Sequence, residues 1–193
     1  MSGNDEMTPA TSGTKLTYDD FLLFPDDGQR HELIDGEHYV TPAPNFSHQV
    51  ILGNLYFLIR SYLEGHPTGR VLLSPFDVIF SKFDVVEPDL LYLSKAREAS
   101  VQEHGLTGSP DLVVEIASKS TRKRDQTVKF RLYERMDVLE YWTVDRKTAA
   151  VRVYRKAGDE FDKAVELSLD RGDVLTTPLF PGLQLRLADI FKE

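Results

Sequence analysis

The sequence predicts an α/β fold, in which a mixed central sheet is flanked by helices and extended by additional antiparallel strands. Three observations lead to this class: hairpin signals, two amphipathic helix patterns, and a nearly continuous apolar run at residues 111–117. An amphipathic helix must bury one face against another element, and a strand that is apolar throughout is typical of a sheet covered on both faces. Strands and covering helices are therefore expected to share one core.

The first half of the chain alternates helical and strand patterns. A short helix is predicted at residues 17–23, and a hairpin at residues 31–40, where Asp35-Gly36 is a turn dipeptide between two strand-like runs. A long amphipathic helix is expected at residues 47–64, after two prolines that interrupt strand pairing. Residues 70–80 have the β-branched and aliphatic content of a strand that is interrupted at Pro75.

The second half is expected to complete the sheet. Residues 85–93 are predicted to pair antiparallel with residues 70–80, and the apolar run at 111–117 is predicted to be a central strand. A second long helix is expected at residues 122–136, with Val128, Leu132 and Met136 facing inward. Three further strands are predicted after it, at residues 139–144, 149–155 and 161–169.

Length and composition favour one domain at residues 16–193, preceded by a flexible tail at residues 1–15. A chain of 193 residues can close one core but is short for two. The first fifteen residues are polar and lack the features of a signal peptide, and no apolar run approaches the length of a membrane span. A cytoplasmic protein without a membrane anchor is expected.

Charge and cysteine content narrow the classes of ligand. Without cysteine, any metal must be held by oxygen or imidazole. A net charge of -8 argues against a general polyanion binder, yet residues 119–135 carry seven cations and two acids. Such a basic segment is a candidate anion contact, although a solvated helix face is the more common explanation of a charge run.

Two acids stand inside apolar runs, Asp89 in residues 85–93 and Glu115 in residues 111–117. A buried carboxylate costs several kcal/mol unless a cation or a donor compensates it. On adjacent strands the two charges would repel by roughly 4 kcal/mol at about 4 Å, and a hard divalent metal between them would remove that repulsion. Spacing leaves the alternative open that Asp89 caps a turn and Glu115 pairs with an arginine.

The second predicted helix carries further candidates. Lys129 lies four residues after Asp125 and could reach Glu115, although spacing favours a surface ion pair worth under about 1 kcal/mol. Positive charge opposes the dipole at a helix N-terminus, and phosphate binding there would explain it. The cations at that position are Arg122, Lys123 and Arg124.

Glu32 and His48 complete the set of candidates. Glu32 could be a third acid at a metal, and His48 could hold a phosphate or a water molecule, but for each residue alone a solvated or capping role is the more common explanation. The sequence contains no G-x-S-x-G, Walker, H-E-x-x-H or G-x-G-x-x-G motif. Acyl transfer, nucleotide hydrolysis by a phosphate loop, zinc proteolysis and dinucleotide binding therefore find less support.

Short motifs follow one another from about residue 16 to the C-terminus. They are ELIDGE at 32–37, PNFSH at 44–48, SPFDV at 74–78, EPD at 87–89, PDLVVE at 110–115, SKST at 118–121, Asp125 with Lys129 and Tyr133, and EYW at 140–142. In this order and spacing they resemble the Uma-type family of putative restriction endonucleases, which is similar to the PD-(D/E)XK nuclease superfamily. The resemblance implies a restriction-endonuclease-like fold and metal-dependent hydrolysis of phosphodiester bonds, with DNA as the substrate.

The resemblance also implies roles for residues. Asp89 matches the PD element and Glu115 the (D/E) position, so both would bind Mg²⁺ or Mn²⁺, with Glu32 as a further acid. The superfamily places a lysine where this chain has Ala117, which implies that Lys129 has taken over, with Lys119 as a fallback. Lys129 would then position a water molecule, while the cations at 122–124 would hold flanking phosphates.

The assembly and the activity leave alternatives open. A homodimer would suit cleavage of both strands of a duplex, because two-fold symmetry relates those strands. Two rival functions remain at this stage. One is a non-catalytic descendant of the nuclease fold that binds nucleic acid or a protein, and the other is a small-molecule phosphoesterase that would not need the basic segment.

Overall fold

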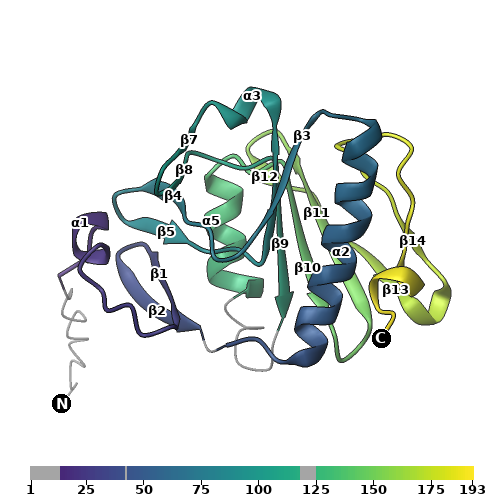
Figure 1. Ribbon diagram of the computed structural model, residues 1–193, viewed down its shortest axis with the longest axis horizontal. Coiled ribbons are helices and arrows are strands. Elements are labelled where there is room, and N and C mark those ends of the chain that lie inside the picture. The colour runs from purple at the N-terminus through teal and green to yellow at the C-terminus, as the bar shows by residue number, and fades with distance from the viewer. Residues whose placement is uncertain (1–13, 42, 118–124) are drawn as a thin grey trace, which may run out of the picture.

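Strand β9 (Leu112–Ala117) lies in the middle of the larger sheet, and all six of its residues are buried. In this computed structural model the described residues are 14–41, 43–117 and 125–193. The sheet order is β12-β11-β10-β9-β6-β3, and β13 pairs with β11 (Figure 1). The other strands of this sheet are β3 (Gly69–Leu73), β6 (Leu90–Ser94), β10 (Glu140–Asp145), β11 (Ala150–Ala157), β12 (Glu160–Phe161) and β13 (Val165–Ser168).

The larger sheet is mixed, as the sequence predicts. Strand β10 runs parallel to β9, whereas β6 runs antiparallel to β9 and β11 antiparallel to β10. The predicted pairing of residues 70–80 with residues 85–93 is confirmed, because β3 pairs with β6 antiparallel. The expected α/β class with helices flanking mixed sheets is therefore confirmed.

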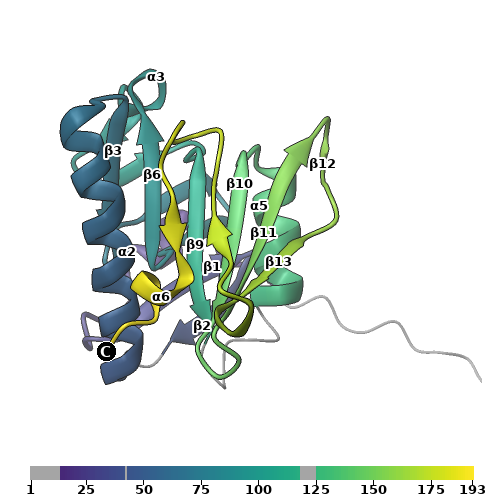
Figure 2. The same ribbon diagram turned by 90° about the vertical axis from the view of Figure 1, so that its right-hand side faces the viewer.

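Two helices cover opposite faces of this sheet (Figure 2). Helix α2 (Phe46–Gly65) packs on one face, where Leu112, Val114 and Ile116 of β9 join its apolar side. Helix α5 (Phe130–Arg135) packs on the other face, where Val113 belongs to the second core cluster. Successive residues of β9 alternate between the two clusters, as the two-residue period of a strand requires. Both faces of the sheet at β9 are buried, which explains the continuous apolar run at residues 111–117.

A smaller sheet has the order β2-β1-β5-β4-β8-β7. The predicted hairpin is confirmed, because β1 and β2 pair antiparallel around Asp35 and Gly36, both at positive φ. Since φ is positive at both central residues, an Asp-Gly dipeptide fits this turn. The strands are β1 (Arg30–Ile34), β2 (Glu37–Thr41), β4 (Val78–Ser81), β5 (Asp84–Val86), β7 (Val101–Gln102) and β8 (Gly105–Thr107).

The sequence predicts one strand at the apolar run 85–93, but the structure has two strands there. Strand β5 of the smaller sheet ends at Val86, and the chain then enters the larger sheet as β6, which begins at Leu90. Pro88 in the intervening segment has no backbone N–H to donate to a ladder. Asp89 therefore lies at the crossing between the sheets instead of in mid-strand, and the segment between them carries site residues.

The second long helix also differs from expectation. Among the described residues it begins with a π-helical turn, η1 (Asp125–Lys129), and continues as α5. Leu132 is buried, and Val128 and Met136 pack beside it, so the predicted inward stripe is confirmed. The cations at residues 122–124, Lys119 and nearly all of the predicted tail at residues 1–15 lie outside the described residues.

The remaining elements are short. The polar connection at residues 94–109 contains a helical turn and two of the small strands. Within the described ranges, no helix has the combination of length and apolar character needed to cross a bilayer. The short elements not yet named are α1 (Tyr18–Phe21), α3 (Lys95–Glu98), η2 (Leu169–Arg171), β14 (Val174–Leu175), β15 (Leu185–Arg186) and α6 (Leu187–Ile190).

Candidate active site

The register of β6 and β9 brings the two predicted acids together. Leu90 pairs with Val114 in an antiparallel ladder, so Asp89 stands one residue beyond that pair, opposite Glu115. Residues directly opposite one another in such a pair have Cβ atoms about 5 Å apart in regular geometry. The amide of Ile116 donates to Asp89 Oδ2 at 2.8 Å, which confirms that the two strands stay adjacent at this level.

Asp89 is 2% exposed and is held by three donors. Arg30 Nη1 donates to Oδ1 at 2.7 Å, and His48 Nε2 donates to Oδ2 at 3.0 Å, beside the Ile116 amide. Burial raises the pKa of Asp89, but the hydrogen bond and charge of His48, the charge of Arg30 and the amide outweigh it and lower the pKa to about 2. Asp89 is therefore ionised at neutral pH.

The first turn of α2 positions His48. Asn45 precedes the helix as its N-cap, and its Oδ1 accepts the amide hydrogen of His48 at 3.1 Å. This cap satisfies one of the free N–H groups of the helix start. His48 is buried as a result of pointing inward from this turn, toward Asp89.

Glu115 belongs to a second group of contacts, in which Lys129 holds two acids. Lys129 Nζ donates at 2.8 Å to Glu115 Oε1 and at 2.8 Å to Glu32 Oε1. Tyr133 Oη donates to Glu115 Oε1 at 2.7 Å, and burial, followed by the charge of Glu115, raises the pKa of this tyrosine well above its ordinary value. Lys129 is only 2% exposed, so this ion pair has little screening by water.

Strand β1 joins the two groups. Arg30 and Glu32 are two residues apart, so the pleat directs them to the same side of the strand. Arg30 binds Asp89, while Glu32 binds Lys129 and also accepts the amide hydrogen of Glu87 at 3.1 Å. Burial opposes the charge of Arg30, but Asp89, Glu115 and Glu32 raise its pKa above its ordinary value.

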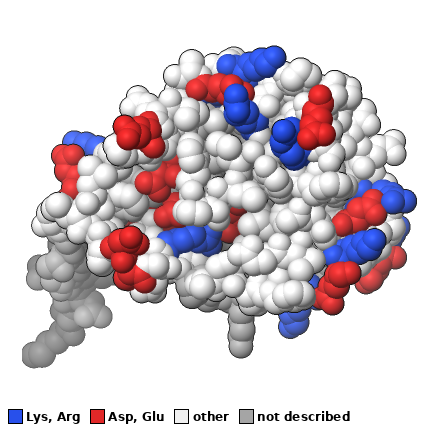
Figure 3. Space-filling view, viewed as in Figure 1, with Lys and Arg blue, Asp and Glu red and all other residues white. Residues whose placement is uncertain are grey.

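Two further acids border these groups. Burial raises the pKa of Asp77 to about 6. Burial and then the charge of Asp77 raise the pKa of Glu87 to about 7, although Arg30 lowers it. Acidic side chains gather around a basic one where β1 and β5 approach β9 (Figure 3). The neighbourhood is rich in carboxylates, and burial raises the pKa of two of them, Asp77 and Glu87.

The donor set fits a hard divalent cation. Carboxylate oxygens are the ligands that Mg²⁺ prefers, and one or two protein carboxylates with water molecules suffice for it. Glu87 Oε2 is buried and accepts no hydrogen bond from the described residues, which is consistent with a site that still has acceptor capacity. Within that part of the chain, no three His, Asp or Glu side chains form a ready-made metal cluster.

The structure brings together most of the residues singled out from the sequence. Asp89 and His48 lie in one group of contacts, and Glu115, Glu32 and Lys129 lie in the other. Ala117, where the superfamily has its lysine, is a buried residue at the end of β9. The predicted phosphate contacts Arg122, Lys123 and Arg124 fall outside the described residues.

Sequence reasoning missed Arg30 and assigned no role to Tyr133. Arg30 lies two residues before Glu32 in a strand, and that two-residue spacing could have indicated a shared face. Tyr133 lies four residues after Lys129, which places both on one face of a helix. Each of these neighbours could have been proposed from periodicity alone.

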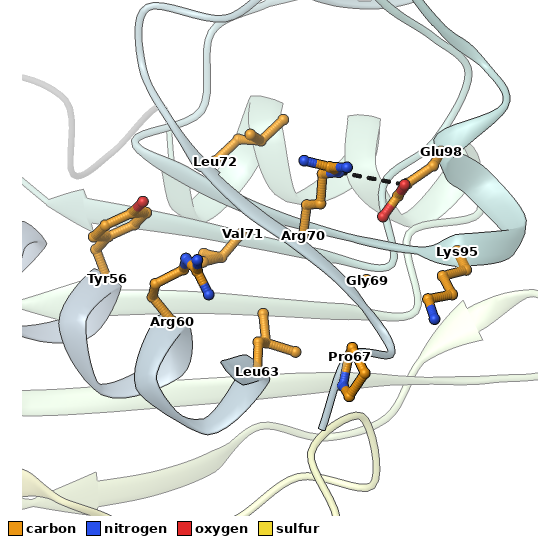
Figure 4. Close-up of a pocket in the computed structure, with 10 residues that line it drawn as sticks. All are labelled: Tyr56, Arg60, Leu63, Pro67, Gly69, Arg70, Val71, Leu72, Lys95 and Glu98. Carbon is orange, nitrogen blue, oxygen red and sulfur yellow. Dashed lines mark ion pairs between the residues drawn. The ribbon is translucent and has the colours of Figure 1, made fainter. Parts of the chain in front are cut away.

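A cavity of about 380 Å³ lies elsewhere, at the C-terminal end of α2 (Figure 4). Arg60 of α2, Arg70 of β3 and Lys95 of α3 line it, and Arg70 pairs with Glu98 at 3.3 Å. The cavity shares no residue with the two groups of contacts around Asp89 and Glu115. The candidate active site is therefore a buried cluster of charges instead of this hollow.

Comparisons with known proteins agree with this architecture. Residues 18–188 match the model of the Uma2 family, described as putative restriction endonucleases. A curated relative, the uncharacterised protein slr1290 of Synechocystis, is 27% identical over 157 residues, which cover 79% of this chain and 80% of the relative. A crystal structure of a putative nuclease belonging to DUF820 from Anabaena variabilis superposes with a TM-score of 0.77 at 21% identity, covering 91% of this chain and 97% of that one.

Proposed function

Since this chain belongs to the Uma2 family and has a nuclease-like fold, we propose that it is a Mg²⁺- or Mn²⁺-dependent endonuclease that hydrolyses phosphodiester bonds in DNA. The family and the fold support a nuclease. One observation carries the finer proposal: Lys129 Nζ is shared by Glu32 and Glu115, and Asp89 stands opposite Glu115, just before β6 begins. Carboxylates from neighbouring segments can hold a divalent cation, and a lysine beside them can stabilise negative charge on a phosphate.

In this proposal Asp89 and Glu115 would hold the cation. A bound Mg²⁺ or Mn²⁺ would supply Lewis-acid polarisation of a phosphoryl oxygen and a nucleophile at neutral pH. Arg30 and His48 keep Asp89 ionised and fix its orientation through 2.7 Å and 3.0 Å contacts. A carboxylate that is already charged and oriented needs no reorganisation when a cation arrives.

Lys129 would orient the attacking water and stabilise charge on the phosphate. Its ammonium group is held in place by Glu32 and Glu115, which both accept from Nζ at 2.8 Å. Glu32 thereby acts as a positioning residue for Lys129. In the reaction, the water oxygen bonds to phosphorus, the bond to the leaving oxygen breaks, and the water proton is balanced by protonation of that oxygen, which leaves a phosphate monoester and a hydroxyl end.

Three parts of the proposal come from the sequence expectations alone. Arg122, Lys123 and Arg124 would hold flanking phosphates, because positive charge at a helix start binds anions. A homodimer would match the two-fold symmetry of duplex cleavage. A cytoplasmic location completes the proposal.

Cleavage assays with matched variants test the proposal. Supercoiled plasmid and labelled oligonucleotides are incubated with Mg²⁺ or Mn²⁺ and with the wild type, Asp89→Asn, Glu115→Gln or Lys129→Met. Each variant is expected to lose at least about 100-fold in rate, as removal of one electrostatic contact to a transition state commonly does. Glu140→Gln is the matched control, because Glu140 is equally buried on the next strand but contacts none of the site residues above.

Other outcomes would exclude the proposal. Cleavage that survives both acid substitutions would show that the reaction occurs elsewhere. Salt-dependent DNA binding without cleavage under either metal would identify a non-catalytic descendant of the fold. Turnover of small phosphoesters alone would identify a phosphoesterase. Calorimetric titration with Mn²⁺ provides a readout independent of activity, since Glu115→Gln should weaken binding and Glu140→Gln should not.

A further inference from the structure

Strand β3 is an edge strand of the larger sheet, because it pairs with β6 and has no second neighbour among the described strands. An edge strand presents N–H and C=O groups to which a further strand can bind. Proteins commonly protect such edges with charges or cover them, so an edge alone carries no conclusion. In this protein, however, the edge borders the cavity of about 380 Å³ at the C-terminal end of α2.

The pairing of β3 with β6 determines which backbone groups of β3 point outward. In an antiparallel pair, every second residue exchanges hydrogen bonds with its partner, and the residues between direct their N–H and C=O groups away. The Lys95 amide donates to the Thr68 carbonyl at 2.9 Å, and the next residue, Gly69, lies opposite Ser94. The backbone groups of Gly69 and Val71 therefore point to the outer edge. Within the described ranges, no hydrogen bond reaches them there.

The cavity runs along this outer edge. Four consecutive residues of β3, 69–72, line it, although successive residues of a strand point to opposite faces of a sheet. Val71 packs in the core cluster beneath α2, and Leu72 packs against the cluster on the other face. The cavity therefore borders the edge and not one face alone. Helix α2 supplies the other wall through Tyr56 and Leu63 (Figure 4).

The charges around the cavity favour an acidic ligand. Its cationic lining residues are Arg60, Arg70 and Lys95, whereas the whole chain has a net charge of -8. Arg70 pairs with Glu98, the one acid in the lining, at 3.3 Å, and Arg60 pairs with Glu64 at 3.6 Å. Lys95 forms no ion pair with the described residues. Exposed pairs of this kind contribute little, so these cations can exchange their partners for a ligand.

The edge and the charges together distinguish three kinds of partner. The phosphates of a nucleic acid accept hydrogen bonds but do not donate them, so the outward C=O groups of β3 would stay unpaired. A second copy related by a two-fold axis would bring the same cations close to one another, which is unfavourable. An extended acidic peptide can both donate to and accept from the edge, and it complements the cations.

We propose that an extended acidic segment of a partner protein binds in this cavity as an added strand beside β3. The outward backbone groups of Gly69 and Val71 supply affinity, and the three cations around the cavity select acidic side chains. The proposal does not depend on the nuclease function, and its test measures binding without cleavage.

Selection from a displayed library of random linear decapeptides, with the wild type as the target, tests the choice of ligand. Acidic peptides should be enriched. Their affinity, measured by fluorescence anisotropy, should fall at least about 10-fold for Arg60→Glu and for Arg70→Glu, because reversal replaces attraction by repulsion. Lys147→Glu is the matched control, since Lys147 is exposed after β10 and does not line the cavity.

The backbone contacts are tested on the selected peptide itself. One version is N-methylated at its odd positions, and another at its even positions. Because an added strand turns only every second N–H toward its neighbour, one version should lose at least about 10-fold in affinity and the other should keep most of it. An equal effect of the two methylation patterns would reject an added strand.

Three further results would overturn the proposal. Absence of acidic peptides from the selection, or equal affinity of Arg70→Glu and Lys147→Glu, would reject the peptide site. Displacement of the peptide by a random-sequence oligodeoxynucleotide, with oligonucleotide binding lost in Arg70→Glu, would assign the cavity to phosphates. Self-association of the wild type in sedimentation that the peptide reverses would assign the edge to a second copy. The cleavage assays would still decide the nuclease proposal separately.

Discussion

Glu115 and Glu140 stand on adjacent parallel strands, and both are almost fully buried, with exposures of 3% and 2%. Glu140 is satisfied by a structural network: Trp142 Nε1 donates to Oε2 at 2.8 Å, and Thr177 Oγ1 donates to Oε1 at 2.7 Å. Arg155 adds an ion pair at 3.2 Å. Glu115, in contrast, shares one lysine ammonium with a second acid, Glu32.

The difference shows which property of a buried acid indicates function. Burial is common to both residues, so it does not distinguish them. Trp142, Thr177 and Arg155 donate to the single carboxylate of Glu140, whereas Lys129 donates to two buried carboxylates, those of Glu32 and Glu115. Glu140 also lies at the first residue of β10, while Glu115 lies near the carboxyl end of β9, the edge where ligands bind in many α/β sheets.

The largest expected difference between the two regions follows removal of the cation. Lys129→Met should lower the free energy of unfolding by about 3–5 kcal/mol, because it leaves two buried carboxylates without their shared cation. Arg155→Met should cost only about 1 kcal/mol, since the Arg155 side chain is 34% exposed and Glu140 keeps two neutral donors. Urea denaturation measures both values.

A double variant checks the cause of the Lys129 effect. Lys129→Met combined with Glu32→Gln should recover part of the lost stability, because only one of the two carboxylates that Lys129 contacts still carries a charge. Equal losses in the Lys129 and Arg155 variants, or no recovery in the double variant, would contradict the comparison.

Neutralising each acid should separate stability from activity. Glu140→Gln should lose about 1–2 kcal/mol, since an amide has one acceptor oxygen where the carboxylate accepts from Trp142, Thr177 and Arg155. Glu115→Gln should change stability less, because Lys129 and Glu32 remain as a balanced pair. The nuclease rate should fall strongly in Glu115→Gln and little in Glu140→Gln. If both variants lost stability and rate in parallel, the two acids would have the same structural role.

The smallest expected effect concerns an acid at the border of the site. Burial raises the pKa of Asp77 to about 6, above its ordinary value of 3.8, so the folded protein binds this proton more tightly than the unfolded chain. Stability conferred by the neutral form is therefore present below about pH 4 and is lost as pH rises to about 6.

Asp77→Asn removes that pH dependence. The variant should match the wild type near pH 4 and be more stable by about 1–2 kcal/mol above pH 6, after allowance for partial exposure. Unfolding midpoints between pH 4 and 7 measure the difference. If the stability difference between Asp77→Asn and the wild type were constant from pH 4 to 7, the ionisation of Asp77 would not be its cause.

Several elements were predictable because their information is local. The Asp35-Gly36 turn needs positive φ at both residues, and the observed values are 53° and 75°. The apolar stripe of residues 47–64 predicted α2, and the continuous apolar run predicted β9 as the central strand. The break at residues 87–89 was not predictable in the same way, because apolar content does not tell to which of two sheets a strand belongs.

The composition of the site was partly predictable as well. Asp89 and Glu115 could be selected because carboxylates inside apolar runs need compensation. The groups that compensate these carboxylates could not be predicted, because they are distant in the sequence. Arg30 and Asp89 are 59 residues apart, and Lys129 and Glu32 are 97 residues apart. Helix periodicity limited Lys129 to a face, but it did not choose between solvent and Glu115.

The sequence by itself determined the α/β class, the main helices and strands, the family resemblance and the acids that require a partner. All of these features follow from local patterns in the sequence. Only the tertiary structure decided which cation each acid receives, because that choice depends on how β1 and η1 are placed against β9. Electrostatic interactions in a dry interior act over a few ångströms, and those distances exist only after the sheets have packed.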